Sequence, residues 1–225
     1  IDSFKELAPF DVHHLWHEDL GWRKAKIHND AIRMSRGDLL IFIDGDCVLM
    51  PNFVSDHQEI FEVEKSNYVL MGRRVELGAD ISERINILNY NKLLVKNSFR
   101  YFLSALCKRT HGGFRKFTIK NKQIRKLLKA DDVKDLIGAN FSIPKSKLVD
   151  INGFNEETDE LGVTEDGDIF VRLRNTNTKI IGKKYFAPMF HKCHDRGSRV
   201  ATDEYYNTIL KDYDYKYAGK GLEQK

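Results

Sequence analysis

Hydrophobic positions in this chain fall into helical stripes and short continuous runs. Between residues 21 and 34 the apolar residues recur at roughly helical spacing, with Lys and Arg between them: Trp22, Ala25, Ile27, Ala31, Ile32 and Met34. Gly37 follows as a helix stop. Residues 39–43 (LLIFI) are a continuous apolar run, which is typical of a strand buried on both faces of a parallel sheet. A helix that leads into such a strand predicts an α/β fold.

The rest of the chain predicts shorter elements. In the first half we expect a short mixed strand at 11–16, a helix that begins at Pro51 and carries Phe53, His57, Ile60 and Phe61, and a strand at 68–71 closed by Gly72. In the second half we expect a strand or loop at 138–143, a short helix at 145–151, and a turn at Asn152 and Gly153. Residues 166–173 then form the beginning of a helix, and 179–186 are strand-like. From residue 203 the acidic and aromatic tail predicts a partly ordered helix with a frayed end.

Composition limits the class of protein. With 225 residues, 41% hydrophobic and 31% charged, the chain has the composition of an ordinary globular protein, and we expect one domain at 1–202 followed by a tail at 203–225. No apolar run approaches the roughly 20 residues that span a bilayer. The three cysteines (Cys47, Cys107, Cys193) form no CxxC pair, which disfavours a disulfide framework or a cysteine zinc site and favours a reducing compartment.

Residues 91–134 form a basic insert that differs from the rest of the chain. It is dense in Lys and Arg, nearly free of acids before Asp131, and interleaved with aromatic residues, and Gly112-Gly113 divides it into two expected helices. A solvated charged face is the default interpretation, and contact with anionic lipid headgroups is the alternative. A third interpretation is a nucleic-acid surface. The formal net charge of +4 is small and no nucleic-acid-binding motif accompanies the insert, so no nucleic acid is expected.

The first motif with candidate chemistry is Asp44-Gly45-Asp46, directly after the apolar run of 39–43. Open α/β sheets bind ligands just past the carboxyl ends of their strands. Carboxylates at that place, with Gly leaving the backbone open, suit a hard divalent cation that also binds phosphates. The alternative is a solvated turn, because Asp-Gly is a common turn pair.

The second motif is Glu165-Asp166-Gly167-Asp168, directly before the apolar sequence IFVRL. Acidic residues favour a helix N-terminus, so capping is the alternative interpretation. Three carboxylates in four positions exceed what capping needs, and their mutual repulsion requires compensation. A carboxylate held in this way can take a proton from an acceptor hydroxyl.

The third motif is the pair His191 and His194 in the sequence MFHKCHD. Two imidazoles three residues apart can meet one metal ion on a helix or a turn, whereas a lone histidine is usually structural. Taken together, the three motifs can hold a cation that bridges two phosphates, and they offer a carboxylate that activates a hydroxyl. That is the chemistry of sugar transfer from a nucleotide diphosphate.

The motifs also resemble a known enzyme family. The segment GWRKAKIHNDAIRMSRGDLLIFIDGDCVLMPNFVSDH is similar to the central part of bacterial family 2 glycosyltransferases of the GT-A fold. LIGANFSIPKSKLVDINGF, EDGDIFVRL and HKCHDRGS resemble the C-terminal half that these enzymes share with β-1,4-galactosyltransferases. Outside the basic insert the matches extend to about Arg199. The resemblance implies a Rossmann-like GT-A fold with a mixed central sheet flanked by helices. It also implies an N-terminal truncation, because the family's first strand and helix have no counterpart before Ile1.

The resemblance implies a role for each matching residue. Asp46 would ligate the metal, Mn²⁺ (or Mg²⁺), with Asp44 against the ribose and the metal region, and with His194 and His191 as further ligands. Asp166 would be the base of an inverting displacement, supported by Glu165. Trp22 and Lys24 would contact the uridine and the diphosphate. The loop under the donor sugar would consist of Gly138, Ala139 and Asn140.

The expected function is inverting, metal-dependent transfer of galactose or N-acetylgalactosamine from a UDP-sugar. The acceptor would be a glycan or lipid-linked glycan in surface polysaccharide or lipopolysaccharide synthesis, in the cytoplasm or at the inner face of the membrane. The chain has ELGVTED at 160–166 where the family has GWGxED, so the tryptophan that packs on the sugars is absent and their identity stays open. The alternative is a truncated, non-catalytic transferase-like module that binds carbohydrate or a partner.

Overall fold

The computed structural model describes residues 1–86, 89, 119–128, 130, 138–161, 164–182, 184–194, 212 and 214–223. The described helices are α1 (Asp2–Leu7), α2 (Lys24–Met34), α3 (Phe53–Glu64), α4 (Ala79–Arg84), α6 (Lys122–Leu127), α7 (Lys145–Asp150), α8 (Glu157–Leu161) and α9 (Glu165–Asn175). The described strands are β1 (Leu39–Ile43), β2 (Cys47–Leu49), β3 (Tyr68–Met71), β4 (Arg73–Glu76), β5 (Asn140–Pro144), β6 (Lys179–Gly182) and β7 (Pro188–His191). Within this part of the chain no helix has the length and apolarity to cross a membrane.

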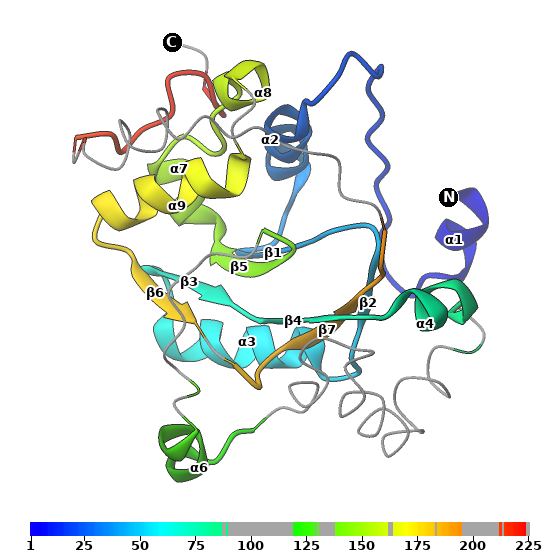
Figure 1. Ribbon diagram of the computed structural model, residues 1–225. Coiled ribbons are helices and arrows are strands. Elements are labelled where there is room, and N and C mark those ends of the chain that lie inside the picture. Colours follow the sequence, from blue (N-terminus) through cyan, green and yellow to red (C-terminus); the bar gives the residue numbers. More distant parts are fainter. Residues whose placement is uncertain are drawn as a thin grey trace.

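The strands form two mixed sheets (Figure 1). The first has the order β1-β5-β3-β6, with β5 antiparallel to both of its neighbours and β3 parallel to β6. The second has the order β2-β7-β4, with β7 antiparallel to β2 and parallel to β4. Mixed sheets flanked by helices confirm the α/β class and the mixed sheet that we expect from the sequence.

The first sheet lies between two layers of helices. Successive residues of a strand point to opposite faces. Val69 and Met71 of β3 therefore pack with residues of α2, α7 and α9 in one core cluster. Tyr68 and Leu70 pack with residues of α3 in a second cluster on the opposite face. All four residues are fully buried, which explains why β3 is apolar at every position.

Several predicted elements are confirmed. The expected helix at 21–34 is α2, on which Ala25 and Ile32 face the core. The expected helix from Pro51 is α3, the strand at 68–71 is β3, and the helices at 145–151 and 166–173 are α7 and α9. The turn at Asn152 and Gly153 is formed by positive backbone φ angles of 62° and 69°.

The prediction of a doubly buried strand in a parallel sheet at 39–43 was wrong in part. β1 is an edge strand of the described sheet and pairs antiparallel with β5. Leu40 and Phe42 pack on one core cluster, and Leu39 and Ile41 pack on the other, although all four stay partly exposed. An apolar run therefore indicates that both faces of the strand pack against other residues. It does not indicate the direction of the strand or whether the strand lies at the edge of the sheet.

Three smaller predictions also need correction. Residues 11–16 form no strand and are mostly exposed, because no described strand lies beside them. The strand-like stretch at 179–186 is shorter, since β6 ends at Gly182 and positive φ angles at Tyr185 and Ala187 turn the chain into β7. In the tail, residues 203–211 and 213 lie outside the described residues, whereas 214–223 form no helix and pack on the domain, with Ala218 fully buried. Most of the basic insert, including its glycine pair and Cys107, lies outside the described residues.

Candidate active site

The first acidic motif forms the turn between β1 and β2. Asp44 accepts a hydrogen bond from the backbone N–H of Cys47 through its carbonyl oxygen, at 3.2 Å. The side chains of Asp44 and Asp46 are 31% and 32% exposed, so both carboxylates are held by the turn and still reach solvent. Burial, together with the charges of Asp46 and Asp44, raises the pKa of the Cys47 thiol to about 12.

Asp46 lies against both predicted histidines. Its Oδ2 atom is 3.2 Å from His191 Nε2 and 3.0 Å from His194 Nε2. The antiparallel register of β2 and β7 places Cys47 opposite His191, which brings the neighbouring Asp46 to the end of β7. One ligand atom from each of the three residues lies within 4.8 Å of the others. A carboxylate and two imidazoles converging in this way fit a divalent metal ion and leave coordination positions for phosphate or water.

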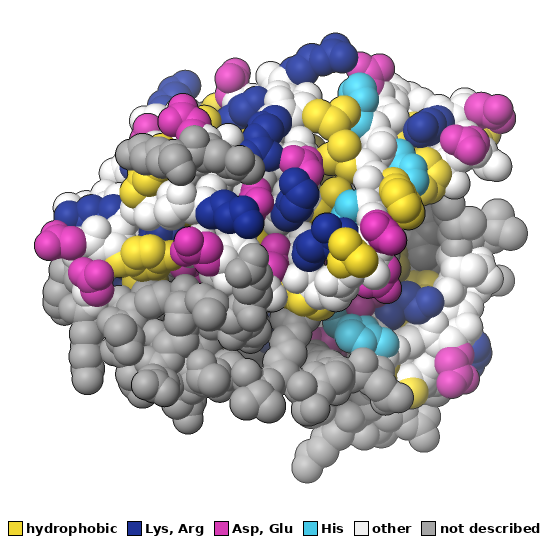
Figure 2. Space-filling model, turned by 90° about the horizontal axis from the view of Figure 1, so that it is seen from above, with side chains coloured by type: hydrophobic (Ala, Val, Ile, Leu, Met, Phe, Trp, Pro, Cys, Tyr) yellow, Lys and Arg dark blue, Asp and Glu magenta, His cyan; other side chains and the backbone are white. Residues whose placement is uncertain are grey.

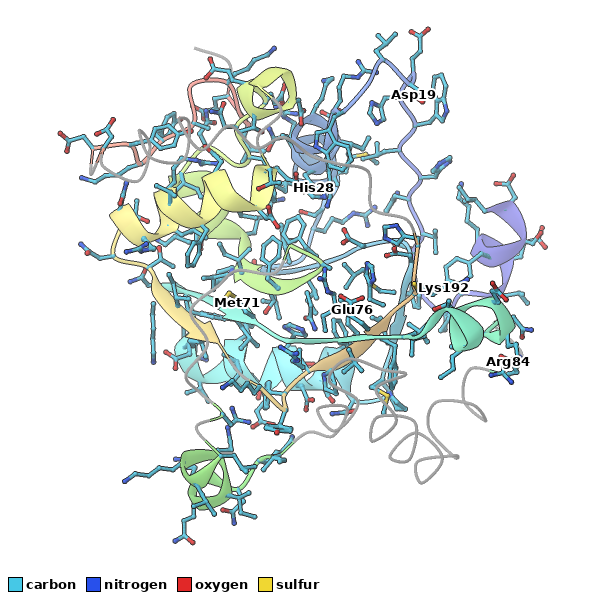
Figure 3. All side chains as sticks on the ribbon, viewed as in Figure 1. Asp19, His28, Met71, Glu76, Arg84 and Lys192 are labelled. Atoms are coloured by element: carbon cyan, nitrogen blue, oxygen red, sulfur yellow. The ribbon has the colours of Figure 1, made fainter. Side chains whose placement is uncertain are left out.

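Sequence reasoning missed a fourth residue of this cluster, Glu76 on β4. Its Oε2 atom lies 3.0 Å from Nδ1 of His191, while its Oε1 accepts from Nε of Arg74 at 2.8 Å. The parallel pairing of β4 with β7 places Glu76 opposite His191, and Figure 3 labels it on β4. A metal-binding histidine commonly donates its second N–H to a carboxylate, which fixes the ring and its tautomer. Nothing in the sequence around Glu76 indicates this contact.

Lys24 connects the first acidic motif to the second. Its Nζ atom lies 3.0 Å from Asp44 Oδ1 and 2.8 Å from Glu165 Oε1. Burial alone would lower the pKa of Lys24, but its interactions with Glu165 and Asp44 together outweigh burial and raise the pKa above its ordinary value. The ammonium is therefore charged. Its two contacts show that the turn after β1 lies next to the first turn of α9.

Asp166 and Glu165 differ in their surroundings at the start of α9. Asp166 is partly exposed, and its two carboxylate oxygens accept from the backbone N–H groups of Gly167 at 2.9 Å and Gly138 at 3.3 Å. The side chain of Glu165 is only 3% exposed, and its Oε2 has no partner among the described residues. Gly138 lies so close that a Cβ atom there would be 2.7 Å from Asp166 Oδ2. Asp166 is thus the accessible carboxylate and Glu165 the buried one.

The third carboxylate of the second motif faces the interior. Asp168 is 1% exposed and pairs with the fully buried Arg172 at 2.6 Å. Glu165 is compensated by Lys24 in the same way. The repulsion expected between three neighbouring carboxylates is therefore relieved by two cations from different directions.

The remaining predicted residues differ in how exposed they are. Trp22 precedes α2 and is 44% exposed. Ala139 and Asn140 are buried, and the Asn140 side-chain amide donates to the carbonyl oxygens of Arg73 and Ala187. Of the predicted loop 138–140, Gly138 is therefore the residue beside Asp166, whereas the Asn140 side chain belongs to the core.

His28 is a further residue that the sequence did not single out. It lies on α2 one turn after Lys24 (Figure 3). Its ring packs against those of Phe42 and Phe154 at centroid distances of 5.4 and 4.6 Å, and these two rings also contact each other at 5.4 Å. Burial is the main reason that its pKa is lowered to about 4, and the charge of Lys24 adds to the shift. Neutral His28 therefore forms part of the packed support behind Lys24.

Charged side chains of both signs gather with histidines on the face seen in Figure 2. A carboxylate with two imidazoles, a bridging ammonium and a partly exposed carboxylate can together bind an anionic, metal-associated ligand and accept a proton from a neutral one.

Comparison with solved structures supports the fold. The chain is similar to a structure described as GalNAc-T7 with UDP, GalNAc and Mn²⁺, with a TM-score of 0.51 and 9% identity, over 85% of this chain and 35% of that chain. A mycobacterial protein matches with a TM-score of 0.34 and 14% identity, over 92% of this chain and 52% of that one, which is too low a score to support an argument. The chain thus spans about a third and about half of these two chains. No curated protein matches.

The sequence profile described as Glycosyl transferase family 2 matches residues 1–150, which include α2, β1 and the Asp44-Gly45-Asp46 turn. The match covers well over half of the 225 residues, and the GT-A architecture of the solved neighbour agrees with it. The chain therefore belongs to glycosyl transferase family 2.

Proposed function

We propose that the chain is an inverting, metal-dependent glycosyltransferase that uses a UDP-sugar, with galactose or N-acetylgalactosamine as the sugar. The observation that carries the proposal is the Lys24 bridge, at 3.0 Å to Asp44 and 2.8 Å to Glu165. In the proposed site one group of carboxylates serves donor and metal binding and the other serves proton removal, and the Lys24 bridge joins these two groups, which lie far apart in the sequence.

Asp46, His191 and His194 would hold the metal, Mn²⁺ or Mg²⁺, with Asp44 beside it and Glu76 orienting His191. When bound, the ion would neutralise charge on the leaving diphosphate. A mixed set of carboxylate and imidazole ligands, one of them supported by a further carboxylate, favours a resident metal over a chance cluster of polar side chains. The Mn²⁺ in the name of the similar GalNAc-T7 structure agrees with this choice of ion.

Asp166 would act as the general base. In an inverting displacement the acceptor hydroxyl gives its proton to this carboxylate while its oxygen bonds to the anomeric carbon, and the bond from that carbon to the diphosphate oxygen breaks. The backbone N–H groups of Gly138 and Gly167 orient the two carboxylate oxygens. The ammonium of Lys24 would also be close to the diphosphate, which its charge favours.

The acceptor we propose is a glycan or lipid-linked glycan of surface polysaccharide or lipopolysaccharide synthesis, with the enzyme in the cytoplasm or at the inner face of the membrane. The basic insert at 91–134 would make the membrane contact through its Lys, Arg and aromatic residues. Sedimentation with vesicles of anionic and of neutral lipid tests this part separately. Equal binding to both kinds of vesicle would contradict it.

Ligand-induced stabilisation tests the core of the proposal. UDP with Mn²⁺ should raise the melting temperature of the chain more than either alone, because only the folded state binds them. Asp46→Ala should abolish that combined effect. Asp11→Ala is the matched control, since Asp11 is 79% exposed and its ion pair, with Arg36 at 3.8 Å, lies on the surface. The absence of a combined effect in the unmodified chain, or its persistence in Asp46→Ala, would contradict the proposed donor site.

A further inference from the structure

The C-terminal segment 214–223 is a fixed part of the fold. Asn152 donates to the carbonyl oxygen of Ala218 at 2.8 Å and accepts from the backbone N–H of Glu223 at 2.7 Å. A Cβ atom on Gly221 would lie 1.9 Å from the carbonyl oxygen of Asn152, so the segment approaches the turn at 152–153 too closely for a side chain. Figure 1 shows this segment beside α8, at the end of the fold that also holds α7 and α9.

Within this segment Tyr215 lies along α9. Its carbonyl oxygen accepts from Nδ2 of Asn175, the last residue of α9, at 2.9 Å. Its hydroxyl donates to Oδ1 of Asp168, in the first turn of the same helix. Between these ends the guanidinium carbon of Arg172 lies 6.0 Å from the centroid of the tyrosine ring. A single residue therefore contacts both ends of α9, the C-terminal end through its backbone carbonyl and the first turn through its hydroxyl.

Asp168 is the residue through which Tyr215 acts on the first turn. Its Oδ2 accepts from Nε and Nη2 of Arg172 at 2.9 and 2.6 Å, and its Oδ1 accepts from Tyr215. Both oxygens of this buried carboxylate are thus engaged inside the protein. Arg172 in turn donates to the carbonyl oxygens of Ile151 and Gly153 at 2.9 and 2.8 Å. Asp168 is therefore an anchor of the helix start.

We propose that Tyr215 is a positioning residue for Asp166, an inference that rests on the proposed function. Asp168 is two residues from Asp166 in the same helical turn, so its anchor sets the direction in which the Asp166 carboxylate points. Proton transfer depends steeply on such placement, because a misplacement of about 1 Å can lower a rate by roughly a hundredfold. The match to the family profile ends at residue 150, so the contacts between Tyr215, Asp168 and Arg172 lie in the part of the chain beyond that match.

Tyr215→Phe tests the proposal because it removes the hydroxyl and keeps the ring over Arg172. Turnover is measured as Mn²⁺-dependent release of UDP from UDP-N-acetylgalactosamine or UDP-galactose, whichever the unmodified chain uses. We expect kcat to fall on the order of tenfold while the calorimetric affinity and stoichiometry for UDP with Mn²⁺ stay unchanged. Amide hydrogen exchange of the peptide covering 164–168 should become faster. Tyr217→Phe is the control, since Tyr217 is 37% exposed and its hydroxyl is 3.5 Å from Glu223.

Any of three results in hydrogen exchange or turnover would overturn the inference: unchanged exchange at 164–168, faster exchange with unchanged kcat, or an equal effect of Tyr217→Phe. Loss of UDP–Mn²⁺ stoichiometry in Tyr215→Phe would also overturn it, by showing a general loss of folded protein. An unmodified chain that turns over no UDP-sugar would instead contradict the proposed function, and hydrogen exchange would then still decide whether Tyr215 holds the helix start.

Discussion

Lys24 Nζ lies 2.8 Å from Glu165 Oε1, a contact between residues that are 141 positions apart in the sequence. The Glu165 side chain is 3% exposed and that of Lys24 is 26% exposed. Lys24 also contacts Asp44 at 3.0 Å, so the ammonium connects the two acidic motifs of the candidate site.

Lys24→Met should destabilise the fold by about 2 kcal/mol, because it leaves the buried Glu165 carboxylate without its cation. The value is below that of a fully buried pair because Lys24 is about a quarter exposed. Urea unfolding at pH 7 measures the change. Adding Glu165→Gln removes the unpaired charge and should recover part of the loss, so a double variant less stable than Lys24→Met would contradict the bridge.

Asp166→Asn should lower kcat by about 10²- to 10⁴-fold and leave binding of UDP with Mn²⁺ unchanged, because the amide keeps the shape and cannot take up the proton. On the same preparation, UDP release measures kcat and calorimetry measures the binding of UDP with Mn²⁺. Asp150→Asn, at a side chain that is 62% exposed, serves as the control. Turnover within twofold of the unmodified chain would remove Asp166 from its role as base.

Much of the first sheet and part of the site could be predicted from the sequence. Asp44, Asp46 and Asp166 stand out because they adjoin apolar runs, and the two histidines because they are three residues apart. Glu76 and Tyr215 could not be found in that way. Glu76 meets His191 only through the pairing of β4 with β7, and Tyr215 meets Asp168 only because the tail folds back along α9. Contacts that depend on strand order, or on a distant segment that folds back onto the domain, leave no pattern in the local sequence.

Glu76→Gln should weaken the affinity for Mn²⁺ in the presence of UDP by about 10- to 100-fold. The amide keeps the size of the side chain but loses the charge that orients His191 from 3.0 Å and favours its bound tautomer. Isothermal titration with Mn²⁺ measures the change. Glu59→Gln is a control of the same chemistry at a side chain that is 46% exposed. An unchanged affinity in Glu76→Gln would show that His191 needs no such support.

Stability should fall as the pH is lowered from 7 to 5. Burial lowers the pKa of His57 to about 4 from its ordinary 6.5, with Nδ1 2.7 Å from Ser142 Oγ and Nε2 3.1 Å from Asn140 Oδ1. The unfolded chain therefore binds this proton first, and its binding favours unfolding as the pH falls below about 6.5. One such histidine accounts for about 2 kcal/mol between pH 7 and pH 5. His57→Gln should reduce the difference between unfolding free energies at the two pH values by that amount, whereas His13→Gln, at an exposed position, should preserve it.

Gly138→Ala should lower kcat by about 10- to 100-fold without unfolding the chain. The new Cβ would lie 2.7 Å from Asp166 Oδ2 and 3.0 Å from its Cβ, so the atoms that can move away are those of the carboxylate itself. Gly37→Ala is the matched control, because its Cβ would meet only the carbonyl oxygen of Leu39, at 3.5 Å. UDP release gives kcat, and thermal unfolding shows whether the fold is kept. A folded Gly138→Ala variant with unchanged kcat would mean that turnover tolerates displacement of Asp166.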